Sequence, residues 1–216
     1  MRALTAMLVA LVLLAGCGGD DGSPSAGDDP TEVTECAEVD APEAREPGSA
    51  EAPSAELDSS KTYTLTFDTS CGAFTVTLDS EQAPKTAASL VSLANAGYFD
   101  DTIFHRVVPG FVVQGGDPTQ RGDGGPGYST VDAPPSDAAY TQGVVAMAKT
   151  QVEAPGTSGS QFFVVTGADA GLPPDYAIVG EVTDGMDTVL RIDALGVGDG
   201  PPSQPVVVNT VTVGES

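Results

Sequence analysis

Histidine and cysteine, the residues on which zinc sites and many catalytic triads depend, are scarce in this 216-residue sequence. There is one histidine, His105, and three cysteines, Cys17, Cys36 and Cys71. A zinc site needs closely spaced Cys or His pairs, and a Ser-His-Asp triad needs a histidine beside its serine. The run at 156–160 lacks the G-x-S-x-G order of a serine nucleophile turn. We therefore expect no metal, no cofactor and no hydrolytic triad.

Three other stretches combine polar donors with apolar and aromatic residues. They read FHRVVPGFVVQGGD at 104–117, GVVAMA at 143–148 and GSQFF at 159–163. In order and spacing, and together with YAIVGEV at 176–182, they closely resemble the cyclophilin family of peptidyl-prolyl isomerases. The resemblance covers nearly the whole chain from residue 61 onward.

The resemblance implies an enzyme that accelerates rotation about the X-Pro amide bond. The barrier to this rotation is about 18–20 kcal/mol, and lowering it requires no nucleophile. It requires a donor that stabilises the twisted amide and a pocket that holds the proline ring. Arg106 matches the family arginine in the donor role, which suits a guanidinium because it stays charged and directs several N–H groups from one plane. Gln114 matches the glutamine that orients the arginine and the substrate carbonyl.

The resemblance also implies a substrate-binding surface beside these two catalytic residues. Its members are His105, Phe111, Val112, Ala146, Met147, Ala148, Gln161, Phe163, Leu172 and Tyr176. Taken singly, the apolar members would be core residues and Arg106 a surface charge, so only their joint spacing favours a site. We expect His105 to hydrogen-bond locally or to line the rim, because the mechanism needs no base.

The predicted partners are proline-containing polypeptides. An alternative is a binding or chaperone module that uses the same groove without turnover. Arg106 favours the enzyme, because binding of the ring alone would not require it.

The elements that must position these residues are mostly strands. Apolar residues alternate with polar ones at 63–67 and 74–78 on either side of a turn at 69–72, which predicts a hairpin. Pro84 and Gly97 bound a predicted helix, and a shorter one is expected at 185–192. Further strands are expected within 103–113, 143–148, 161–165, 177–182 and 206–213. This pattern predicts a mainly β domain at 61–216, and the resemblance implies a closed eight-stranded antiparallel barrel capped by two helices.

The first residues resemble an export signal of a lipoprotein. Arg2 precedes an apolar run at 3–15, which suits a signal peptide better than a bilayer span or a core helix. The ending Leu-Ala-Gly-Cys at 14–17 resembles the bacterial lipobox. We therefore expect removal of residues 1–16 and lipidation of Cys17. The mature protein would be anchored in the cell membrane, on its extracytoplasmic face.

Acidic residues dominate the chain, with a formal net charge of -23. This charge argues against nucleic acid as a partner, because a polyanion is bound through clustered Lys and Arg. Residues 18–60 contain thirteen acids and one base, Arg45, with few large apolar residues. This composition predicts a disordered, extended tether over residues 17–60 rather than a specific acidic binding tail. We expect a monomer.

One disulfide is expected outside the cytoplasm. Once Cys17 carries lipid, Cys36 and Cys71 remain, and an even pair in an oxidising compartment suggests a bond between them. The bond would attach the end of the tether to the domain and contribute roughly 3 to 4 kcal/mol.

Overall fold

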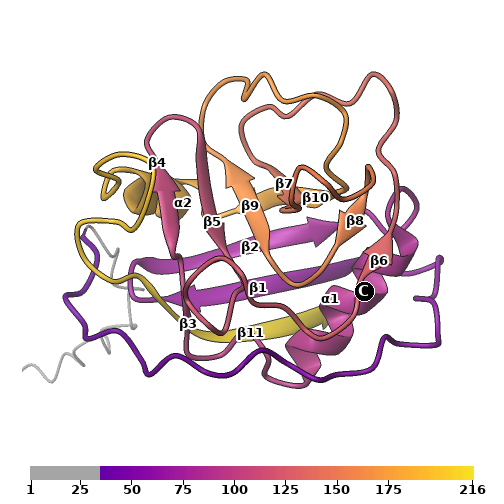
Figure 1. Ribbon diagram of the computed structural model, residues 1–216, viewed down its shortest axis with the longest axis horizontal. Coiled ribbons are helices and arrows are strands. Elements are labelled where there is room, and N and C mark those ends of the chain that lie inside the picture. The colour runs from indigo at the N-terminus through magenta and orange to yellow at the C-terminus, as the bar shows by residue number, and fades with distance from the viewer. Residues whose placement is uncertain (1–34) are drawn as a thin grey trace, which may run out of the picture. The chain divides into compact units, whose positions relative to one another are not determined.

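The structure is a computed structural model and describes residues 35–216. This part of the chain contains two antiparallel sheets and two helices (Figure 1). The predicted signal peptide and the lipidation site at Cys17 lie outside these residues. The helices are α1 (Pro84–Asn95) and α2 (Met186–Asp193). The strands are β1 (Tyr63–Thr69), β2 (Gly72–Leu78), β3 (Thr102–Ile103), β4 (Arg106–Val108), β5 (Val112–Gly115), β6 (Thr130–Val131), β7 (Val144–Met147), β8 (Thr157–Ser158), β9 (Phe162–Val165), β10 (Ile178–Asp184) and β11 (Val207–Glu215).

The main sheet contains nine strands in the order β3-β11-β1-β2-β10-β7-β9-β5-β4, and β6 and β8 form a separate pair. The prediction of a mainly β fold with two helices is confirmed. The predicted closed eight-stranded barrel is wrong, because the sheet is an open, curled half-barrel. Its two end strands, β3 and β4, follow one another in the chain with only Phe104 and His105 between them. The chain joins them end to end, and among residues 35–216 no ladder pairs them side by side.

The core fills the inside of the curled sheet. In β1, the alternation predicted from the sequence buries Tyr63, Leu65 and Phe67. The ring of Phe67 stacks on Phe74 of β2 at 4.8 Å, and the hairpin prediction is confirmed. Burial of such side chains contributes about 1.5–3 kcal/mol each and is the main force that holds the strands together.

Each helix buries an apolar face against strands. Pro84 opens α1, where its missing N–H costs no hydrogen bond, and Gly97 follows the helix with φ +65°. Leu90 of α1 and Ile192 of α2 are buried. Both predicted helices are therefore present at the expected places. None of the helices between residues 35 and 216 is long and apolar enough to cross a membrane.

The residues before β1 run along the surface of the domain in an extended conformation (Figure 1). We call residues 36–50 the strap. The sequence predicted a solvated tether over 17–60, and the strap shares its extended form. However, main-chain N–H groups of Arg45, Gly48 and Ala50 donate at 2.8 Å to the carbonyls of residues 118, 125 and 126. Composition does not reveal such bonds, because they involve the main chain.

A disulfide and a side chain of the strap itself also hold it against the domain. Cys36 and Cys71 form the expected disulfide, with an S–S distance of 2.03 Å, and Cys71 is fully buried. The guanidinium of Arg45 donates to the carbonyls of Tyr98 and Asp100 at 2.6 and 3.0 Å. The strap therefore lies against the loop at 117–127, which borders the candidate site.

Candidate active site

Arg106 and Gln114 face each other on neighbouring strands. They are direct partners in the antiparallel register of β4 and β5, which the tight turn around Gly110 sets. Side chains of such a pair lie on the same face of the sheet. Arg106 Nη1 donates to Gln114 Oε1 at 3.2 Å. The structure thus brings the two predicted catalytic side chains together.

A cavity of about 290 Å³ opens beside this pair. Besides Arg106 and Gln114, its lining contains most of the predicted substrate-binding residues: Phe111, Val112, Ala148, Phe163, Leu172 and Tyr176, together with Lys149. The ring of Tyr176 meets that of Phe163 edge to face at 5.7 Å. The cavity therefore combines an apolar wall with two cationic side chains, those of Arg106 and Lys149.

Two predicted members, Ala146 and Met147, do not line this cavity, and both are fully buried on β7. Alternation along the strand separates them. Ala146 pairs with Phe163 and lies behind the cavity wall, whereas Met147 pairs with Phe162 and packs in the main core. Met147 therefore contributes to the core rather than to the wall that meets a ligand.

Gln161 connects the pair of Arg106 and Gln114 to a second cavity of about 230 Å³. Its side chain accepts from Gln114 Nε2 at 3.0 Å and donates to the carbonyl of Gly124 at 2.9 Å. Gln114, Ala148 and Lys149 line both cavities. A peptide bound beside Arg106 could therefore extend over Gln161 into the second cavity.

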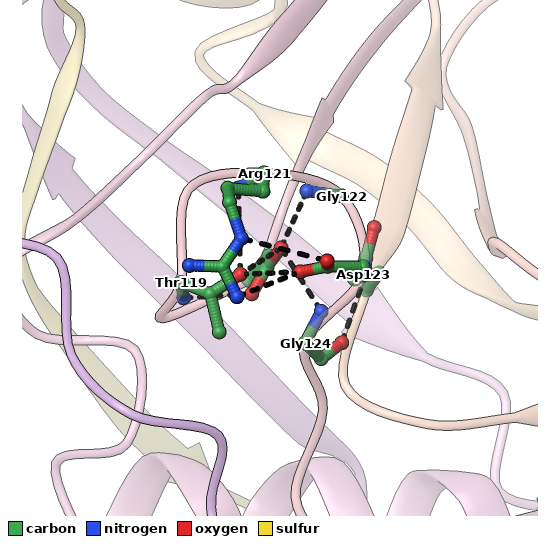
Figure 2. A network of polar contacts seen from close by, with 7 residues as sticks. Thr119, Arg121, Gly122, Asp123 and Gly124 are labelled. Atoms are coloured by element: carbon green, nitrogen blue, oxygen red, sulfur yellow. Dashed lines mark hydrogen bonds and ion pairs between the residues drawn. The ribbon is translucent and has the colours of Figure 1, made fainter.

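The loop at 119–124, whose polar contacts are drawn in Figure 2, forms part of this second cavity. The buried carboxylate of Asp117 shapes this loop. Asp117 accepts from the backbone N–H groups of Thr119, Gly122 and Gly124 at 2.7, 2.6 and 3.2 Å, and from Thr119 Oγ1 at 2.9 Å. Burial raises the pKa of Asp117, but these hydrogen bonds outweigh it, so the pKa lies below its ordinary value. The ionised carboxylate thus holds the Gly124 carbonyl where Gln161 reaches it.

Comparison with known proteins agrees with this geometry. Residues 64–213 match the family model described as cyclophilin type peptidyl-prolyl cis-trans isomerase/CLD. The chain belongs to this family.

Similar proteins of known name extend the same conclusion to most of the domain. A probable peptidyl-prolyl cis-trans isomerase A of Mycobacterium leprae is 37% identical over 170 residues, which cover 69% of this chain and 91% of that protein. A peptidyl-prolyl cis-trans isomerase-like 1 of Emericella nidulans is 42% identical over 132 residues, which cover 59% and 80%. This cyclophilin is therefore a peptidyl-prolyl cis-trans isomerase.

Solved structures agree in fold. The crystal structure of a Cryptosporidium parvum cyclophilin type isomerase matches with a TM-score of 0.65 and 28% identity, over 71% of this chain and 98% of that one. A second crystal structure of that protein, in the presence of the dipeptide Ala-Pro, matches with a TM-score of 0.64 and 29% identity, over 70% and 98%.

His105 of this cyclophilin is not at the rim. The residue is only 7% exposed, and neither ring nitrogen has a hydrogen-bond partner among the residues that the structure describes. Burial lowers the pKa of His105, the nearby Asp117 opposes this change, and Arg106 adds to it. The expected local hydrogen bond is absent from this part of the chain, and the ring packs beneath the site as a neutral side chain.

Two further charged residues lie at the site, and one of them, Asp199, was missed by the sequence analysis. Asp199 accepts from Arg106 Nε at 2.5 Å and from Nη2 at 3.2 Å. The ammonium of Lys149 lies 5.4 Å from the centre of the Tyr176 ring and donates to the carbonyls of Thr150 and Glu153. No spacing could indicate Asp199, because 93 positions separate it from Arg106.

Proposed function

We propose that this cyclophilin accelerates cis-trans isomerisation of X-Pro bonds in exported proteins, with Arg106 as the donor to the prolyl nitrogen. The observation that carries this proposal is the position of the Arg106 guanidinium at the edge of a cavity with an apolar wall. The structure of the similar Cryptosporidium protein in the presence of Ala-Pro supports a proline peptide as the ligand.

The chemistry follows from how an amide twists. Rotation about the C–N bond removes its double-bond character, and the nitrogen recovers a lone pair that can accept a hydrogen bond. Arg106 can donate an N–H to this lone pair, which is absent from both planar ground states. Its interaction is therefore stronger in the transition state than in either isomer, which is the condition for acceleration.

The apolar wall supplies the second requirement. Phe111, Phe163 and Leu172 offer a surface against which the proline ring can be held by burial of its methylene groups. With the ring held, the part of the peptide before proline turns. Gln114 keeps the guanidinium beside the ring through the 3.2 Å hydrogen bond to Nη1.

Exchange spectroscopy by NMR on a proline peptide tests the enzymatic role. We expect the wild type to accelerate cis-trans exchange and Arg106→Ala to lose roughly 100-fold or more of this acceleration, as when a key donor to a transition state is removed. Arg191→Ala, which removes an arginine on α2 that also pairs with an exposed aspartate, serves as the control. A wild type that binds the peptide without accelerating exchange would instead support the binding-module alternative.

We further propose that the mature chain is anchored through an acylated Cys17 on the extracytoplasmic face of the cell membrane. The apolar run at 3–15 and the Leu-Ala-Gly-Cys ending support this proposal. The disulfide between Cys36 and Cys71 fits an oxidising compartment. Mass spectrometry of the mature N-terminus should detect an acylated Cys17, and Cys17→Ala should release the protein from membranes. A mature form that begins at another residue would contradict the proposal.

A further inference from the structure

The catalytic guanidinium is held on two sides. Asp199 accepts from Nε and Nη2 of Arg106, and Gln114 accepts from Nη1. These contacts use three of the five N–H groups of the guanidinium and leave one free on each terminal nitrogen. A bidentate carboxylate lies in the plane of a guanidinium and fixes that plane, whereas a single acceptor such as Gln114 leaves it free to turn.

The fold places Asp199 beside Arg106 through the outer edge of β4. This strand is one end of the main sheet, and the loop after α2 adds to it where Val107 N donates to the Gly200 carbonyl at 2.8 Å. Gly196 allows this approach, because a Cβ at that position would lie 2.7 Å from the ring of Pro109. Arg106 comes directly before Val107, and Asp199 comes directly before Gly200. In an antiparallel bridge these two positions are diagonal neighbours on one face, within reach of a long side chain such as arginine.

The ion pair of Arg106 and Asp199 is too exposed to contribute much to the stability of the fold. The Arg106 side chain is 31% exposed and that of Asp199 is 68% exposed. Ion pairs so accessible to water contribute little to the stability of a fold. The hydrogen bonds from Arg106 lower the pKa of Asp199, so the carboxylate stays ionised and paired well below neutral pH.

We infer that Asp199 is a positioning residue for catalysis, which fixes the plane of the Arg106 guanidinium so that a free N–H points at the twisted amide. The inference rests on the proposed function. Because errors in position of about 1 Å can cost roughly 100-fold in rate, a guanidinium free to turn should lower the catalysed rate by a smaller amount, about 5- to 20-fold.

The experiment measures isomerisation and peptide binding separately by NMR exchange at several peptide concentrations. We expect Asp199→Ala to lower kcat about 5- to 20-fold with unchanged peptide affinity and unchanged unfolding by urea. The kcat of Asp199→Asn, which keeps one acceptor oxygen, should lie between those of the wild type and Asp199→Ala. Asp187→Ala is the matched control, because Asp187 also pairs with an arginine, at 2.7 Å, and its side chain is 71% exposed. It should change none of these quantities.

Two further measurements distinguish positioning from a general effect. The Nε–H signal of Arg106 should exchange slowly with solvent in the wild type and rapidly in Asp199→Ala. In an Arg106→Ala background, Asp199→Ala should have no additional effect on the rate. An unchanged or raised kcat in Asp199→Ala, or an equal loss in both backgrounds, would overturn the inference. A wild type without activity would overturn the proposed function instead, and the Nε–H exchange would still report whether Asp199 fixes the guanidinium.

Discussion

The side-chain nitrogen of Gln114 donates a hydrogen bond to the side-chain oxygen of Gln161 at 3.0 Å. Gln161 then donates to the Gly124 carbonyl, and Gln114 accepts from Arg106. These three hydrogen bonds form a chain from the Arg106 guanidinium to the Gly124 carbonyl. Because a guanidinium can only donate and a carbonyl can only accept, the two ends of the chain fix the orientation of both side-chain amides. The orientation of Gln114 toward Arg106 therefore depends on a backbone carbonyl in the loop that Asp117 holds.

Replacing Gln161 by Glu should remove one hydrogen bond of this chain, the one to the Gly124 carbonyl. A carboxylate can still accept from Gln114 but cannot donate to the Gly124 carbonyl. A hydrogen bond contributes about 0.5–1.5 kcal/mol, and 1.36 kcal/mol corresponds to tenfold in rate, so we expect kcat/KM to fall roughly two- to tenfold. Gln142→Glu is the matched control, because Gln142 donates to the Thr166 carbonyl away from the cavities. Equal activity of both variants would contradict this role of Gln161.

Truncation of Met147 should mainly lower stability, whereas truncation of Phe111 should mainly weaken peptide binding. Met147 is fully buried, so Met147→Ala should lower the free energy of unfolding by about 2–5 kcal/mol, whereas Met147→Leu should cost less than about 1.5 kcal/mol. Phe111 is only partly buried and lines the cavity. Phe111→Ala should therefore weaken peptide binding with a smaller effect on stability. Urea unfolding and peptide titration measure the two quantities. A Met147→Leu variant that lost binding at full stability would place Met147 at the ligand.

Local patterns predicted much of the fold and part of the site. Alternation predicted the hairpin of β1 and β2, and the family spacing brought Arg106 and Gln114 together because eight residues around a tight turn return the chain to the adjacent strand. Met147 lies in an apolar run, GVVAMA at 143–148, in which no polar residue marks an exposed face, so neither the pattern nor the family motif tells which side of the strand meets the ligand.

The features that sequence did not predict depend on distant parts of the chain. Asp199 reaches Arg106 through a loop that follows α2, and the strap binds through main-chain groups that every residue possesses. Whether the sheet closes depends on whether its end strands, β3 and β4, pair with each other. The alternation of apolar and polar residues in a strand does not predict this pairing. Such contacts become visible only when the topology is known.

His105 should make stability depend on pH in the mildly acidic range. Its ordinary pKa is about 6.5, and burial lowers the pKa in the folded state. Below about pH 6.5 the unfolded chain binds a proton that the folded chain does not, so the free energy of unfolding should decrease as the pH falls from about 6.5 toward the lowered pKa. Because His105 is the only histidine, an NMR titration reports its pKa directly.

A substitution isolates this contribution of His105 from that of the carboxylates. His105→Phe removes a ring without hydrogen-bond partners among the described residues, so no bond is lost. Its urea unfolding between pH 7.5 and 5.5 should lack the part of the decrease that comes from the histidine, whereas the carboxylates contribute equally to both proteins. The same decrease in both proteins would show that burial does not lower the pKa of His105.

The strap should detach when its disulfide is removed. The bond between Cys36 and Cys71 closes a loop with a sequence separation of 35, for which the chain-entropy model gives about 3–4 kcal/mol. The double variant Cys36→Ser and Cys71→Ser should therefore lose about that much of its free energy of unfolding. Beyond this global loss, local opening should expose the main-chain bonds of Gly48 and Ala50.

Amide hydrogen exchange separates the two effects in this variant. The amides of Gly48 and Ala50 should exchange faster by a larger factor than that of Leu65 in β1, because loss of the disulfide makes local opening of the strap more frequent in addition to its effect on global unfolding. Arg45→Ala, which removes two hydrogen bonds from the strap but keeps the disulfide, should raise exchange at Gly48 and leave Leu65 unchanged. Equal acceleration at all three amides in the double variant would mean that the strap and the domain open only together.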